Sequence, residues 1–201
     1  MKKILTIALL LIAINAQGQG LPVPANATLA SLFPDENLRA VVAEVLGPNA
    51  GLTGQRLSDA LARIEVLNAD NRGISDASGI EYLLGLTLLF MNTNQITIIN
   101  LDNNINLTTL GIAYNLLTNI NIGNLVNLIG LGIGGNPLTS LDVSNNIYLT
   151  HLSVFDTKLI SLDISNIIDL TMLWVSETVL TEQNIIGFND NIWLNPPNYS
   201  N

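Results

Sequence analysis

The sequence of 201 residues has no cysteine and only one histidine. The lack of cysteine excludes a disulfide scaffold, a thiolate metal site and a lipid anchor on an N-terminal cysteine. The histidine, His151, is not accompanied by a G-x-S-x-G motif, and the dense Asp and Asn spacing of a calcium loop is also missing. We therefore predict a protein that is not an enzyme and that uses no metal and no cofactor.

Basic residues are scarce as well. Seven Lys and Arg stand against 16 Asp and Glu, which gives a formal net charge of -9. Beyond residue 86 the only basic side chain is that of Lys158. Nucleic-acid binding needs clustered Lys and Arg that neutralise phosphates, so we do not expect a nucleic-acid partner.

The only long uninterrupted apolar run extends from Ile4 to Ala13 and follows Lys2 and Lys3. It is shorter than the roughly 20 residues that a membrane helix needs. Small residues follow it around Ala16 and Gly18, as in a secretory signal peptide. We predict that residues 1–18 are removed by cleavage after Gly18, with Ala16 as the second choice. The mature protein is then secreted or displayed on the cell surface, without a membrane span.

Leucine and isoleucine, by contrast, are abundant and periodic. The template L-x-x-L-x-L-x-x-N-x-L recurs every 21 residues, with copies that start at Leu86, Leu107, Leu128, Leu149 and Leu170. A degenerate copy starts 22 residues earlier, at Ile64. Self-similarity with this period predicts a leucine-rich repeat solenoid with short parallel strands on one face. Alternate residues of a strand face opposite sides, so template positions 4 and 6 are expected to point into the core.

Each unit also has a second half with apolar residues at matching offsets, such as Ile99 and Leu101. This nested pattern of 10 plus 11 residues is similar to the bacterial IRREKO class of leucine-rich repeats, which implies extended segments and turns on the convex side instead of helices. An inward Asn amide can bond the unpaired backbone groups of a turn, so we predict a structural role for the Asn at template position 9. These residues are Asn94, Asn115 and Asn136, replaced by Thr157 and Thr178 in the last units.

Helical segments are expected ahead of the repeats. Asp35 can cap a helix that ends before Gly47, a weaker helix is expected over residues 58–63, and residues 21–34 are expected to form an exposed leader. We assign residues 19–63 to the leader and helical N-terminal cap, 64–181 to the repeats, and 182–201 to a C-terminal cap and tail. In the last part, TEQNIIGF at 181–188 is expected to form a short helix.

Two runs carry a resemblance to a known family. They are LFPDENLRAVVAEVLG, from Leu32 to Gly47, and GISDASGIEYL, from Gly73 to Leu83. They resemble the N-terminal cap and first repeat of internalin-like bacterial leucine-rich repeat proteins, over about residues 32–86. The resemblance implies an extracellular, adhesin-like protein that binds other proteins or host surfaces.

The glycine run GLGIGG at 130–135 is the main local anomaly of the repeats. It predicts a strand with a bare outer face between aromatic residues of neighbouring strands, a trough about 10 to 15 Å wide that admits a peptide strand or a sugar chain. The candidate ligand-binding residues are Phe90, Tyr114, Gly130, Gly132, Gly134, His151, Phe155 and Trp174. A protein partner is the first hypothesis and a glycan the alternative. Two further readings stay open: drift of an unconstrained surface, and a structural protein that assembles end to end or by pairing of its edges.

Overall fold

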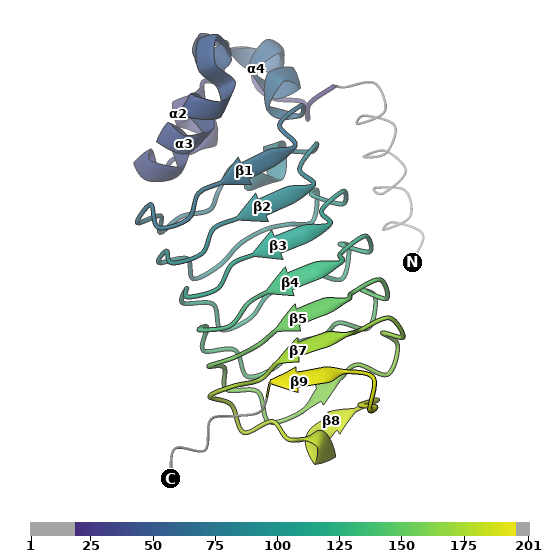
Figure 1. Cartoon of the computed structure of the whole chain (residues 1–201). Coiled ribbons are helices and arrows are strands. Elements are labelled where there is room, and N and C mark those ends of the chain that lie inside the picture. The colour runs from purple at the N-terminus through teal and green to yellow at the C-terminus, as the bar shows by residue number, and fades with distance from the viewer. Residues whose placement is uncertain (1–18, 196–201) are drawn as a thin grey trace.

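The computed structural model describes residues 19–195, so the predicted signal peptide and the tail beyond residue 195 lie outside the described residues. Figure 1 shows a solenoid in which successive coils place their strands on one face. Seven strands form a parallel sheet in the order β1-β2-β3-β4-β5-β7-β9. They are β1 (Val66–Asn68), β2 (Leu88–Phe90), β3 (Thr109–Gly111), β4 (Gly130–Gly132), β5 (His151–Ser153), β7 (Met172–Trp174) and β9 (Trp193–Asn195). The predicted leucine-rich repeat solenoid is confirmed.

The core is a stack of equivalent side chains. Neighbouring strands pair in register one repeat apart, so that Leu67, Leu89 and Leu110 lie side by side. The residues at template positions 4 and 6, such as Leu89 and Met91, are buried in every regular unit, as predicted. Together they form one cluster that continues through the solenoid. Since a fully buried side chain of this kind contributes about 1.5 to 3 kcal/mol, this cluster is the main source of stability.

The convex side has little regular structure, in agreement with the sequence. Among residues 19–195 its pairing is limited to the two-stranded parallel sheet of β6 (Leu162–Asp163) and β8 (Ile185–Ile186). A short 3-10 helix (Ile80–Tyr82) occurs in the first coil. The other described coils return through turns, which keeps the repeat as short as 21 residues.

Helices cover the N-terminal end of the sheet (Figure 1): α2 (Leu29–Leu32), α3 (Glu36–Leu46), a 3-10 helix (Gly47–Gly51) and α4 (Gly54–Leu61). The prediction for α3 and its Asp35 cap is confirmed. Helix α4 begins at Gly54, earlier than the predicted residue 58. The leader is not irregular, because Thr28 and Ser31 form a capping box that starts α2. The sequence does not indicate this helix, because four residues are too few to show a helical period.

Asp35 fastens the helical cap to the first repeat. Its Oδ1 accepts hydrogen bonds from the N–H groups of Asn37 and Leu38, both at 3.0 Å, which starts α3. Its Oδ2 accepts from the N–H groups of Ser75 and Asp76 at 2.9 and 3.1 Å, some 40 residues later. Partial burial raises the pKa of Asp35, but these four backbone donors outweigh it and hold the pKa below the usual carboxyl value.

A ladder of buried asparagines joins the middle coils. Asn115 is representative: its Nδ2 donates to the carbonyl oxygens of Met91 and Ile112 at 2.9 and 3.1 Å, and its Oδ1 accepts from the N–H of Ile96 at 3.0 Å. Asn94 and Asn136 make equivalent bonds one coil away on either side. The predicted structural role of this column is confirmed.

The ladder ends where threonine replaces asparagine. The hydroxyl of Thr157 donates to the carbonyl of Val154 at 2.7 Å, and that of Thr178 to the carbonyl of Val175 at 2.6 Å. Both carbonyls belong to the threonine's own coil, whereas the longer Asn amide reaches the preceding coil as well. The ladder therefore does not join the last coils, where a side-chain bond between coils is made elsewhere, from the hydroxyl of Thr171 to the carbonyl of Thr150 at 3.1 Å.

The C-terminal segment continues the array instead of closing it with a helix. A 3-10 turn (Glu182–Asn184) starts after Thr181, and then β8 pairs with β6 and β9 pairs with β7. The predicted helix over 181–188 is therefore wrong beyond its first turn. Gly187 has φ +87° and packs so closely that a Cβ would lie 2.5 Å from the Cα of Ser165. Because residue 187 has no side chain, the C-terminal segment can pack against the backbone of the preceding coil at Ser165.

Candidate functional site

The strand face arranges the outward side chains in rows across the sheet. The register places Phe90, Gly111, Gly132, Ser153 and Trp174 next to one another, one on each of β2, β3, β4, β5 and β7. Three adjacent small residues thus separate Phe90 from Trp174. Because neighbouring strands lie about 4.8 Å apart, the row is about 19 Å long between its two aromatic residues.

Gly132 in this row and Gly130, two residues earlier on β4, form an open floor. The nearest atom to a Cβ built on Gly132 would be the Cα of Gly111, at 4.0 Å. A Cβ on Gly130 would meet only the side chain of Thr109, at 3.7 Å and beyond. Neither glycine has a positive φ. Backbone geometry and packing therefore do not require glycine at these two positions, and the space above them is free.

Gly134 and Gly135, at the end of the same run, are covered. A Cβ on Gly134 would overlap the ring of Phe155, and a Cβ on Gly135 would lie 2.6 Å from the Cδ1 atom of Tyr114. The rings of Tyr114 and Phe155 contact each other, with centroids 5.2 Å apart and planes tilted by 57°. The trough is thus shorter than the sequence suggests: these two rings close it just beyond Gly132.

Tyr114 and Gly135 belong to a column of residues with left-handed backbone conformation, which was not predicted from the sequence. Its other members are Asn71, Thr93, Asp156 and Glu177, and the non-glycine φ values lie between 46° and 58°. Side chains rarely adopt this conformation, and it costs on the order of 1–3 kcal/mol. Asn71, Gly135 and Asp156 are residue types that adopt it, whereas Thr93, Tyr114 and Glu177 are not. The repeated turn sets Tyr114, Asp156 and Glu177 at the margin of the strand face.

Trp174 contacts rings on both neighbouring strands. The His151 ring is stacked on it, with centroids 6.5 Å apart and an angle of 23°, and the Trp193 ring meets it edge-on at 5.7 Å. The Nδ1 of His151 lies 2.7 Å from the hydroxyl of Thr150. Trp193 is 53% exposed and was not a predicted site residue. Its strand follows the break in the repeat at Gln183, and only the pairing of β9 with β7 brings it to this face.

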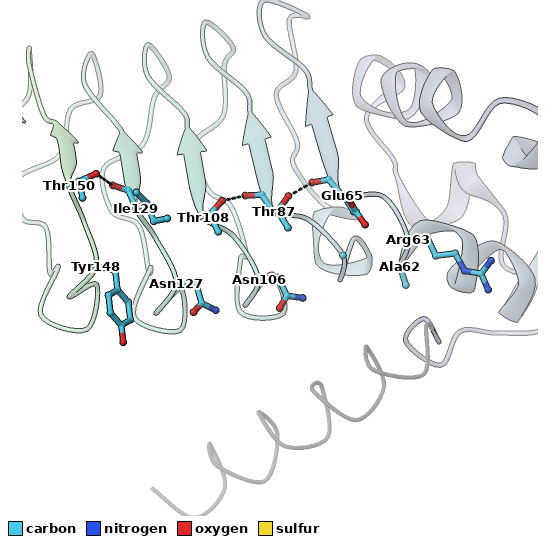
Figure 2. Close-up of a pocket in the computed structure, with 11 residues that line it drawn as sticks. Ala62, Arg63, Glu65, Thr87, Asn106, Thr108, Asn127, Ile129, Tyr148 and Thr150 are labelled. Carbon is cyan, nitrogen blue, oxygen red and sulfur yellow. Dashed lines mark hydrogen bonds between the residues drawn. The ribbon is translucent and has the colours of Figure 1, made fainter. Parts of the chain in front are cut away.

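A second concavity, a groove of about 830 Å³, lies beside the starts of the strands (Figure 2). Its threonine hydroxyls make hydrogen bonds within the solenoid. Thr87, Thr108 and Thr150 donate to carbonyl oxygens of the preceding coil at 3.1, 3.1 and 3.2 Å. The amides of Asn106 and Asn127 reach across coils in the same way, both at 3.0 Å. The threonine and asparagine side chains of this lining therefore hold the solenoid together, whereas the side chains of Arg63, Glu65 and Tyr148 line the groove without a hydrogen bond to another coil within residues 19–195.

The described part of the chain, residues 19–195, contains no group of three or more His, Asp or Glu side chains that could hold a metal ion. Within the same range no helix has the length and apolar character needed to cross a membrane.

The proteins to which this chain is similar are proteins of known structure. No family model and no curated protein matches the sequence. The functional domain of InlJ from Listeria monocytogenes, which includes a cysteine ladder, is 33% identical over 79% of this chain, with a TM-score of 0.68. An internalin (inlF) from Listeria monocytogenes strain 4b F2365 is 27% identical over 79% of the chain, with a TM-score of 0.62. A leucine-rich repeat protein of Leptospira interrogans, 20% identical over 66% of the chain with a TM-score of 0.59, shares the fold.

The repeat, the parallel sheet and the stacked core define the chain as a leucine-rich repeat solenoid protein. Its likeness to two internalin structures, with an N-terminal helical cap ahead of the repeats, makes it an internalin-like leucine-rich repeat protein. It spans 40% and 53% of the lengths of those two chains. Unlike InlJ it has no cysteine for a cysteine ladder, and the buried asparagines join its middle coils instead.

Proposed function

We propose that this chain is an exported, non-enzymatic protein-binding module with an adhesin-like role, and that its partner binds the strand face. One observation carries the proposal: the small residues Gly132 and Ser153 leave an open floor on neighbouring strands, while Tyr114 is 56% exposed and Trp193 is 53% exposed beside it. Exposed aromatic side chains around a flat strip of backbone are typical of protein-recognition surfaces.

Two further observations support this choice of surface. The threonine and asparagine side chains along the second groove and in the asparagine ladder join neighbouring coils, so they have little left to offer a ligand. The two internalins to which the chain is similar are leucine-rich repeat scaffolds, a fold whose regular outer faces suit the binding of other proteins. Export rests on residues 1–18, which we propose to be a signal peptide cleaved after Gly18.

A photoreactive residue tests which face binds. Benzoylphenylalanine at position 151 lies on the strand face beside Gly130, whereas the same residue at position 124 lies on an exposed convex turn as a matched control. Cross-links to proteins of an extracellular extract are expected from position 151 and not from position 124. They should be lost when Gly132→Val is added, because the valine fills the floor of the trough. Equal cross-linking from both positions, or cross-linking from position 151 that survives Gly132→Val, contradicts the proposal.

The glycan alternative needs a free aromatic face for a sugar ring. Trp174 is half-buried between strands that carry His151 and Trp193, and both rings contact it. Tyr114 and Phe155 are tilted against each other. This arrangement favours a protein partner, whose varied side chains can fit between tilted rings.

A further inference from the structure

A column of aliphatic side chains runs along the solenoid ahead of the strand starts, next to the groove of Figure 2. The residue two positions before each regular copy of the repeat is Leu, Ile or Val, and equivalent positions of adjacent coils lie about 4.8 Å apart. The members of this aliphatic column are Leu84, Ile105, Val126, Ile147 and Ile168.

The N-terminal end of the aliphatic column is covered and the rest is not. Leu84 is buried with Ala62, and the side chains of Leu21 and Ile105 pack against this pair. Leu21 belongs to the segment ahead of α2, so the chain itself supplies the cover. Beyond it the column is open: Val126, Ile147 and Ile168 are between 43% and 85% exposed. Aliphatic side chains at one position of successive coils thus form an uncovered apolar strip.

Helix α4 fixes the point at which the covering segment enters the fold. The N–H of Gly20 donates to Oδ1 of Asp59 at 2.8 Å, and its carbonyl accepts from Nε2 of Gln55 at 3.2 Å. The carbonyl of Leu21 accepts from the hydroxyl of Ser58 at 2.6 Å. These bonds hold the beginning of the described chain at the covered end of the aliphatic column, so the residues upstream start from there.

The upstream residues have the composition and the reach to continue this cover. The longest apolar run of the sequence, from Ile4 to Ala13, lies just ahead of the anchored residues. Extended residues span up to about 3.6 Å each, so the seven residues from Ile14 to Gly20 reach up to roughly 25 Å. The column from Ile105 to Ile168 is shorter, at roughly 14 Å for three coil spacings. The apolar run can therefore reach every exposed member of the column.

Charge favours one direction along the column. Lys2 and Lys3 precede the apolar run, and Asp169 directly follows Ile168 at the far end of the column. Asp169 is exposed and makes no ion pair within residues 19–195. A run that begins at Ile168 and ends toward Leu21 places opposite charges next to each other. Exposed pairs contribute little free energy, so apolar contact is the main attraction and charge sets its direction.

We propose that in the uncleaved chain the apolar run Ile4–Ala13 packs on Val126, Ile147 and Ile168, with Lys2 and Lys3 beside Asp169. Residues 1–18 then complete the cover that Leu21 begins, and cleavage after Gly18 opens the aliphatic column in the mature protein. The inference goes beyond the proposed function. It concerns a different surface from the strand face, so that either can fail without the other.

Pairs of engineered cysteines test the contact, because the chain has no cysteine of its own. The full chain is made by cell-free synthesis without membranes, so that residues 1–18 are retained. Oxidation of Leu9→Cys with Ile147→Cys should form an intramolecular disulfide about 10-fold faster than oxidation of Leu9→Cys with Ile98→Cys, since contact raises the effective concentration. Ile98 is 78% exposed and follows the strand ends, away from the column. Adding Leu5→Asp and Leu11→Asp keeps the tether and should abolish the difference.

Protection of a single cysteine gives a second measurement. In the full chain, Ile147→Cys should react with N-ethylmaleimide about 10-fold more slowly than in the same chain with Leu5→Asp, Leu9→Asp and Leu11→Asp, because covering one such side chain is enough for a tenfold change. Ile98→Cys should react at the same rate in both chains. The three aspartates lie outside the folded repeats, so a change at position 147 reports the cover and not the fold.

Three results overturn the inference. The first is equal disulfide formation at positions 147 and 98, or equal labelling at position 147 with and without the three aspartates. The second is protection of position 147 that is lost on dilution, which shows that a second copy covers the column. The third is protection that requires added phosphatidylglycerol vesicles, which shows that lipid covers it.

Discussion

Removal of one amide from the asparagine ladder is the sharpest test of how the coils are joined. Asn115→Ala leaves the buried N–H of Ile96 without its acceptor at 3.0 Å and takes a donor from the carbonyls of Met91 and Ile112. Met91 keeps its bond from Asn94 at 3.0 Å, so the orphaned Ile96 N–H is the largest loss. An unsatisfied buried group costs about 1–3 kcal/mol and each lost hydrogen bond about 0.5–1.5 kcal/mol.

Together these losses predict a decrease of about 3 kcal/mol in the free energy of unfolding. For a chain of this size that corresponds to a melting temperature lower by roughly 6–12 °C. Urea denaturation followed by tryptophan fluorescence measures the first quantity. Hydrogen exchange should in addition become faster at the Ile96 amide, because its bond to Asn115 is gone.

Two companion variants show whether the reasoning is right. Asn115→Thr imitates the natural residues at 157 and 178, keeps a bond to the carbonyl of Ile112, and should lie between wild type and Asn115→Ala. Asn119→Ala, four positions further on in the same coil, changes an exposed amide without a partner among the described residues and should be near neutral. Equal losses at positions 115 and 119 would refute the ladder.

Three other predictions concern the cap, the trough and the last coil. Asp35 has a lowered pKa in the folded state, so its contribution to stability is complete above the unfolded carboxyl pKa of about 3.9 and is lost as pH falls through the lower folded value. Asp35→Asn should therefore destabilise the protein at neutral pH. Denaturation curves of this variant should show less of the acid-dependent loss of stability. Gly132→Val should keep or raise the melting temperature, because its Cβ meets open space, and unfolding of this variant would show that the strand cannot take a side chain. Deletion of residues 182–201 removes β8 and β9 and leaves β6 and β7 as uncovered edges; sedimentation should show self-association, and a monomer with unchanged melting would contradict this.

The sequence by itself determined the fold. A period of 21 residues brings the same positions inward in every coil, and burial of Leu or Ile at those positions depends only on where they fall in the repeat. The Asp35 cap of α3 was predictable because it depends on neighbouring backbone groups, and the buried Asn column was predictable because it recurs at one position of the repeat.

The tertiary structure decided the details of the strand face. Outward residues are not constrained by the core, so their contacts depend on the register between coils. Only that register brings Tyr114 against Phe155, 41 positions away, and Trp193 beside Trp174 across a break in the repeat. Stacking of the coils also imposes the left-handed turn on Tyr114 and Glu177, whose residue types do not favour it. Long-range packing, which a periodic pattern does not encode, thus shaped the surface that we propose binds the partner.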